Sequence, residues 1–208
     1  ADVVAHLAGV CADVLAGNIE GVATDPWTAA QVEARRGRSI KELVDEWSEV
    51  APPVEGMAEH FPGRVATQWV LDLTTHEHDI RHALRTPGAR DSDAVAMALE
   101  FMVGGLATSV AAHGLPPLEV RADGASWVVG GEGETDMGAV LLGAEPPIGG
   151  DRVPEATVEA SGFELFRALT GRRSVDQVRR FSWTGDAERY LPAFTFGPFK
   201  PSAADIDE

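Results

Sequence analysis

The feature that most constrains the fold is an uninterrupted stretch from Arg64 to Arg85, which contains neither glycine nor proline. At the helical step of about 100° per residue, apolar side chains mark one stripe of it: Val65, Trp69 and Ala83. Asp72 and His76 fall on the same stripe, because residues four apart share a helix face. Burying an acid and an imidazole costs free energy unless a partner stabilises them. The stretch therefore predicts a long helix whose apolar seam holds a polar pair, and a metal ion is the first candidate partner.

Three interpretations of Asp72 and His76 stay open from this stripe alone. They belong to a metal site, to a hydrogen-bonded pair in a metal-free core, or to a general base that a carboxylate orients. His6 favours the metal, because it lies on or near the apolar face of a second predicted helix, Asp2–Ala16. Two imidazoles and one carboxylate would leave a coordination position open on Zn²⁺. Asp79 returns to the stripe side beyond His76 and is expected to accept a hydrogen bond from a liganding imidazole or from the helix opposite.

The other histidines are interpreted as outward-facing. His78 and His82 are also four apart, but they lie about 160 to 240° around the helix from the stripe and cannot join Asp72 and His76 at one ion. We interpret their side of the helix as a partly solvated face. Two histidines at segment ends are interpreted as surface residues: His60 and His113.

Composition limits the partners. The 208 residues are 44% hydrophobic, which suits a globular protein with a real core, and the formal charge is −16. This charge argues against binding nucleic acid or an anionic membrane. We find no apolar run of the length of a membrane span and no signal pattern at the start, so the sequence predicts a cytoplasmic protein. Cys11 lies in an apolar run without basic neighbours, which favours a buried structural thiol over a nucleophile.

The first half of the chain reads as helices joined by short loops, which favours an antiparallel bundle. Besides the two helices above, we expect three more helical segments. The first covers 27–35, and the second begins with a capping box at Ser39 and Glu42 and breaks at Pro52-Pro53. The third begins at Asp91 or Ser92 and ends at Ala112. A basic cluster follows the second helix: Arg35, Arg36, Arg38 and Lys41. It is either a solvated turn or an anion clamp.

The periodicity changes after Pro116-Pro117. Short β-rich runs follow at 118–122, 127–129, 139–142, 157–160 and 181–184, and Ser161 caps a predicted helix that ends at Leu169. Asp123-Gly124 is a hairpin signal. We predict an α+β protein of two domains, with a helical bundle over 1–114, a small α+β domain over 115–200 and a frayed tail over 201–208. No Ser-His-Asp triad or dinucleotide-binding glycine pattern is present.

Three motifs carry a family resemblance. DVVAHLAG at 2–9, LDLTTHEHDIRHAL at 71–84 and FELFRALTGRRSVDQVRRFSWTGD at 163–186 resemble the mycothiol-dependent maleylpyruvate isomerase family. The resemblance implies a DinB-like helical bundle followed by the family's C-terminal α+β domain. It also implies zinc as the metal, with His6, Asp72 and His76 as its ligands.

The chain departs from this family in two ways. Asp72 stands where the family usually has a Glu, so the carboxylate is shorter by one methylene. The family usually has a helix before the DVVAHLAG motif, whereas this chain starts at that motif and looks trimmed; a partner chain would be another way to complete the bundle.

The resemblance implies that zinc holds the thiolate of mycothiol, which adds to an electrophilic small molecule as an S-transferase or a cis–trans isomerase. Arg172 and Arg173, or the cluster at Arg35 and Arg36, would hold a carboxylate of that molecule. The alternative is a non-catalytic metal-binding or regulatory module of the same fold. A monomer and a homodimer are both compatible with the sequence.

Overall fold

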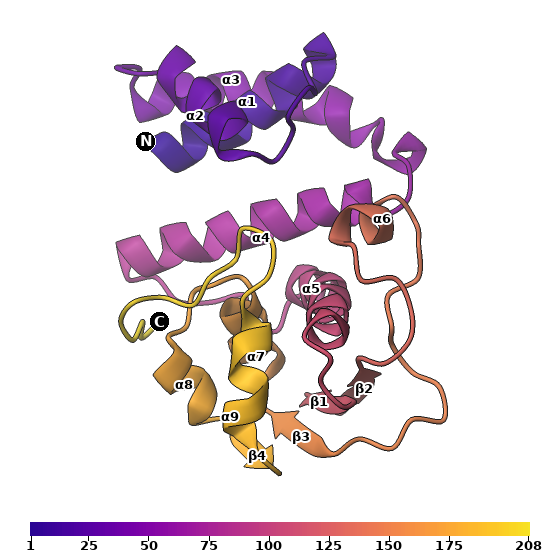
Figure 1. Ribbon diagram of the computed structural model, residues 1–208. Helices are drawn as coiled ribbons and strands as arrows, with labels where there is room; N and C mark the ends of the chain where they lie inside the picture. Colours follow the sequence, from indigo (N-terminus) through magenta and orange to yellow (C-terminus); the bar gives the residue numbers. More distant parts are fainter. The chain divides into compact units, whose positions relative to one another are not determined.

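The computed structural model describes residues 1–208 and has a mixed α+β architecture, as the sequence predicts (Figure 1). The chain divides into two compact units, Ala1–Phe61 and Pro62–Glu208. The chain divides after Phe61, whereas the predicted domain boundary is near residue 114, because α4 and α5 belong to the same unit as the C-terminal strands and helices. The antiparallel DinB-like bundle stays a prediction.

The first unit is made of helices. It contains α1 (Asp2–Ala16), α2 (Asp25–Ala34), α3 (Ile40–Glu55) and the short 3₁₀ helix η1 (Ala58–His60), and α1 packs against both α2 and α3. The predicted capping box is present at Ser39 and Glu42. The predicted break at Pro52-Pro53 is absent, because both prolines lie near the end of α3 and the bond from Gly56 N to Pro52 O, 3.0 Å, closes its last turn.

The capping box gives a local prediction. Ser39 accepts from the backbone N–H of Glu42, and the Glu42 carboxylate accepts from the Ser39 backbone N–H at 2.8 Å. We expect Ser39→Ala to cost about 1 kcal/mol. Hydrogen exchange should show faster exchange in the first turn of α3. Ser48→Ala, which changes a serine later in the same helix, is the control and should leave that first turn unchanged; equal exchange in both variants would contradict the assignment.

The second unit combines helices with one sheet. Its helices are α4 (Val65–Leu84), α5 (Asp93–Ala112), α6 (Met137–Leu141), α7 (Gly162–Leu169), α8 (Val175–Arg179), α9 (Ala187–Tyr190) and the 3₁₀ helix η2 (Leu191–Phe194). Its strands are β1 (Leu118–Ala122), β2 (Ala125–Val129), β3 (Ala156–Glu159) and β4 (Ser182–Thr184), in the order β2-β1-β3-β4. β1 and β3 are parallel and the outer pairs are antiparallel.

The predicted hairpin joins β1 to β2. Asp123 and Gly124 have φ of 47° and 87°, the left-handed values that a tight two-residue turn requires. Asp123 also accepts a hydrogen bond of 2.7 Å from the backbone N–H of Gly162. The turn therefore holds the start of α7 as well as the two strands.

Helix α5 is the core of the second unit. It packs against α4, α7 and β2 and lies between α4 and the sheet (Figure 1). By length and composition alone it could cross a bilayer, since its mean hydropathy is 1.7. The prediction that the sequence has no apolar run of membrane-span length overlooked this helix. Since 72% of this stretch is buried inside the protein, α5 serves here as a core helix.

Three C-terminal details differ from the predictions. The run at 139–142 is not a strand, because Asp136 caps Ala139 N and starts α6 instead. Helix α8 was missed, although Ser174 and Gln177 form a capping box. The tail over 201–208 is not frayed, because its backbone and side chains are bonded to the segment around α8, with Gln177 donating to Ile206 O at 2.9 Å.

Candidate metal-binding residues

Asp72 and His76 lie one turn apart on α4. Oδ1 of Asp72 is 3.5 Å from Nε2 of His76, and the two side chains are 33% and 19% exposed. A direct hydrogen bond between these groups would be shorter, about 2.7 to 3.0 Å. Two ligand atoms that each lie about 2.0 to 2.2 Å from a tetrahedral zinc are roughly 3.3 to 3.6 Å apart. The spacing therefore fits two ligands of one ion.

Asp79 lies on the other side of the His76 ring. Its Oδ2 is 3.3 Å from Nδ1 of His76, the position of the hydrogen-bond acceptor that the sequence predicts. Arg167 and Arg172 also donate to Asp79, at 2.8 Å and 2.7 Å. Burial alone would raise the pKa of Asp79, but the neighbouring imidazole of His76 and the guanidinium groups of Arg172 and Arg167 outweigh burial and hold that pKa far below its usual range. Asp79 is therefore a fixed negative charge, which orients the imidazole and keeps Nε2 as the outward nitrogen.

Arg167 is a site residue that the sequence reasoning missed. Its side chain is 1% exposed, and its guanidinium donates to Thr75 O at 3.2 Å, to Asp79 and to both carboxylate oxygens of Glu208. The available signal was its spacing of four from Phe163, which places an arginine on the apolar face of α7. Arg167 thus ties α4 to α7 and to the tail.

The structure separates the two arginines predicted to bind a ligand. Arg172 is 28% exposed and uses three of its five N–H groups, towards Asp79 and Thr170 O. Arg173 is 2% exposed, and its Nε and one terminal nitrogen donate to the two carboxylate oxygens of Glu164, at 2.6 Å and 2.8 Å. The guanidinium of Arg173 is therefore already paired with an acid, and a ligand-binding role for Arg173 stays a prediction.

His6 lies on α1 in the first unit. Nδ1 of His6 is 2.8 Å from Oε1 of Gln31, and Nε2 of Gln31 donates to Asp13 at 2.8 Å. A carboxylate only accepts, so the amide nitrogen of Gln31 faces Asp13 and its oxygen faces His6. Nδ1 of His6 must then carry the proton, which makes Nε2 the nitrogen that can bind a metal.

Asp72 and His76 on α4, and His6 on α1, are each residue types that could bind a metal ion. Two imidazole nitrogens and one carboxylate oxygen are ligands of the kind that zinc takes in catalytic sites. That His6 completes the pair on α4 stays a prediction from the sequence.

His78 corrects a prediction. It is not part of a solvated face: it is 2% exposed, and its ring packs edge-on against Phe163 at 4.8 Å between centroids. Burial, reinforced by the charge of Arg167, lowers its pKa. His82 is exposed as predicted, and so are His60 and His113.

The basic cluster of the first unit has the structure of a solvated turn. Arg35 and Arg38 both bond Glu46, and the remaining two residues pair with nearby acids, Arg36 with Glu33 and Lys41 with Asp45. An anion clamp is therefore not supported, because each cation already has an acidic partner. Cys11 is buried, as predicted.

Comparison of the chain with family models, with curated proteins and with solved structures finds no match. The resemblance to mycothiol-dependent maleylpyruvate isomerases rests on the motifs quoted above.

Proposed function

We propose that the chain is a zinc-dependent enzyme that activates a low-molecular-weight thiol, such as mycothiol, for addition to an electrophilic small molecule. The reaction is either a thiol S-transfer or a cis–trans isomerisation. His6, Asp72 and His76 hold the metal in this proposal, and one coordination position stays available to the thiol.

The orientation of the two histidines carries the proposal. Nδ1 of His6 is held by Gln31, and Nδ1 of His76 faces Asp79, so both rings present Nε2 as the metal-binding atom. Acceptors behind the liganding rings are the usual arrangement around zinc, because they fix the tautomer and raise the basicity of the ligand. A metal-free core would have no need of the same tautomer at both histidines.

The residues around the metal would have separate tasks. Bound zinc would lower the pKa of a coordinated thiol and so supply a thiolate at neutral pH. Asp72 and His76 would hold the ion from one face of α4, and Asp79 would keep the His76 ring in place. Arg172, with two N–H groups still available, is the cation best suited to a carboxylate of the electrophile.

Metal analysis tests the proposal. Protein purified without chelators should contain about one zinc per chain. His76→Ala should lose that zinc, because two remaining ligands bind weakly, whereas His82→Ala, which changes an exposed histidine of the same helix, should keep it. A well-folded wild-type protein without metal would refute the proposal, and a melting temperature unchanged by chelators would favour the metal-free core.

Thiol binding separates the enzyme from the non-catalytic module. Calorimetry with mycothiol should show binding to the zinc-loaded protein and none to the stripped protein. Zinc without any thiol binding would support the module, which the shorter carboxylate of Asp72 motivates.

A further inference from the structure

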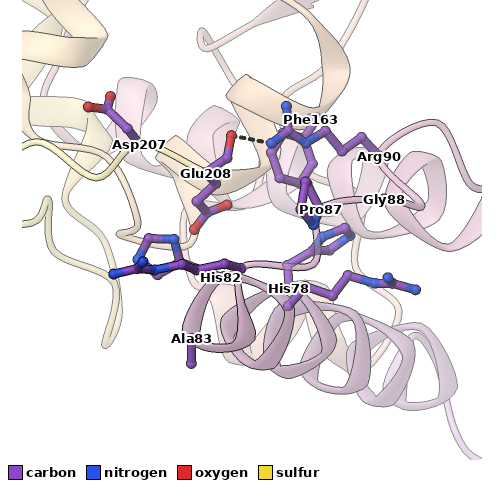
Figure 2. A pocket seen from close by; sticks show the side chains of 11 residues that line it. His78, His82, Ala83, Pro87, Gly88, Arg90, Phe163, Asp207 and Glu208 are labelled. Atoms are coloured by element: carbon purple, nitrogen blue, oxygen red, sulfur yellow. Dashed lines mark hydrogen bonds between the residues drawn. The ribbon is translucent and has the colours of Figure 1, made fainter.

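The second unit contains a cavity at the C-terminal end of α4, away from the proposed metal ligands. Its volume is about 540 Å³, within the range of small-molecule pockets. Its wall comes from the last turns of α4, the loop 87–90, Phe163 of α7 and the end of the tail (Figure 2). His78 faces this cavity and lies about 200° around the helix from His76, so the cavity and the Asp72–His76 pair are on different sides of α4.

One buried polar group at this cavity has no partner. His78 lines the wall, is 2% exposed, and its Nε2 is buried without a hydrogen bond. A buried polar atom in this condition costs free energy, and such atoms are rare unless a ligand or water satisfies them. Its position indicates that a bound molecule completes its hydrogen bonding.

The charges at the cavity are mainly positive. Arg81, Arg85 and Arg90 line it, together with the acids Asp207 and Glu208. The Glu208 carboxylate is already bonded to Arg167, and Arg90 donates to the backbone oxygen of Glu208 (Figure 2). Three arginines gathered at one cavity stand out in a chain with 17 basic and 33 acidic residues.

Two of these arginines are held in place and one is available. Arg81 donates to Glu77 at 2.8 Å, and the guanidinium of Arg90 lies 4.9 Å from the centre of the Phe163 ring. The backbone N–H of Arg85 donates to His82 O at 3.0 Å, whereas its guanidinium is exposed and makes no hydrogen bond or ion pair. A guanidinium donates best to carboxylate or phosphate oxygens, and an aromatic wall accommodates an apolar body.

We propose that this cavity binds a small organic oxyanion with an apolar body, a carboxylate or a phosphate ester. The three arginines hold its charged end, the imidazole of His78 completes a hydrogen bond at the inner wall, and Phe163 packs against its apolar part. This site does not depend on the proposed zinc chemistry.

Calorimetry on the full chain, stripped of metal by a chelator, tests the proposal. The probes are benzoate, phenyl phosphate and the neutral benzamide. At least one of the anions should bind with a dissociation constant below about 1 mM, and benzamide should not. Removal of metal keeps a carboxylate from binding through zinc, so failure here and failure of the proposed function are distinguishable.

Two variants locate the binding. Arg85→Glu should weaken it by about tenfold to a hundredfold, because it replaces a charge-assisted donor with a repelling carboxylate. Arg36→Glu, at an exposed arginine of the first unit, is the charge-matched control and should leave the affinity unchanged. His78→Phe keeps an aromatic ring and removes the nitrogens, so this variant should weaken binding if the protein still folds. If His78→Phe does not fold, Arg85→Glu decides the question, because Arg85 is exposed.

The outcomes are separate. Binding of benzoate alone supports a carboxylate ligand, binding of phenyl phosphate alone supports a phosphate ester, and binding of both supports the shared oxyanion chemistry. The proposal would be overturned if neither anion bound at a concentration of about 10 mM. Equal affinity of wild type and Arg85→Glu would also overturn it.

Discussion

Arg167→Met should lower the free energy of unfolding of the second unit by about 3 to 5 kcal/mol. The reason is the state of its partners. The side chain of Arg167 is 1% exposed, and that of Glu208 is 5% exposed. Methionine keeps the length of the stem but leaves the carboxylates of Asp79 and Glu208 without this guanidinium, and an uncompensated buried charge is costly. Urea unfolding, followed by tryptophan fluorescence, measures the loss.

Arg121→Ala is the matched control for Arg167→Met. Arg121 lies on β1 with a half-exposed side chain that pairs with Glu119 at 2.8 Å. A solvated pair of this kind contributes less than about 1 kcal/mol. If Arg167→Met cost no more than Arg121→Ala, the buried guanidinium would not be the link between α4 and α7 that we describe.

Asp79→Asn should weaken zinc binding by about tenfold to a hundredfold and destabilise the metal-free protein by about 2 to 4 kcal/mol at neutral pH. Asparagine keeps the shape of the side chain but loses the charge that orients the His76 ring and pairs with two arginines. Competition with a chromophoric chelator measures the zinc affinity. Glu77→Gln is the control, because Glu77 is next to His76 in the sequence but its side chain is exposed; this variant should keep the wild-type zinc affinity.

The destabilisation by Asp79→Asn should depend on pH. The folded-state pKa of Asp79 lies below its ordinary value of 3.8, so its contribution is present above that value and is lost as the pH falls towards the folded-state pKa. The difference in stability between wild-type and variant metal-free protein should therefore be largest near pH 7 and shrink below about pH 4. A difference that grows on acidification would show that Asp79 is not a stabilising carboxylate in the folded state.

Local signals account for the parts of the fold that the sequence predicted. The stretch that became α4 has no helix breaker, Ser92 caps α5 as expected, and Asp123-Gly124 makes the hairpin. In each case the deciding interaction lies within a few residues. The phase of α4 also put Asp72, His76 and Asp79 on one side of the helix, which their mutual distances bear out.

Long-range packing accounts for what the sequence did not reveal. Helical phase separated His78 from His76, but whether the far side of α4 meets water depends on Phe163, which follows some 85 residues later. Arg167 is similar, because its acidic partners lie on α4 and in the tail. The error at 139–142 has another origin: the run has β propensity, and the cap at Asp136 outweighs it.

The position of α5 within the chain bears on synthesis. The strands and α7 cover this apolar helix in the folded protein, and all of them follow it in the sequence. At translation rates of about 5 to 20 residues per second, roughly 70 further residues take about 4 to 14 seconds. During that interval the nascent chain carries an exposed segment of membrane-span length and hydropathy. Ribosome-bound chaperones should therefore engage the chain at this stage, before β4 leaves the exit tunnel.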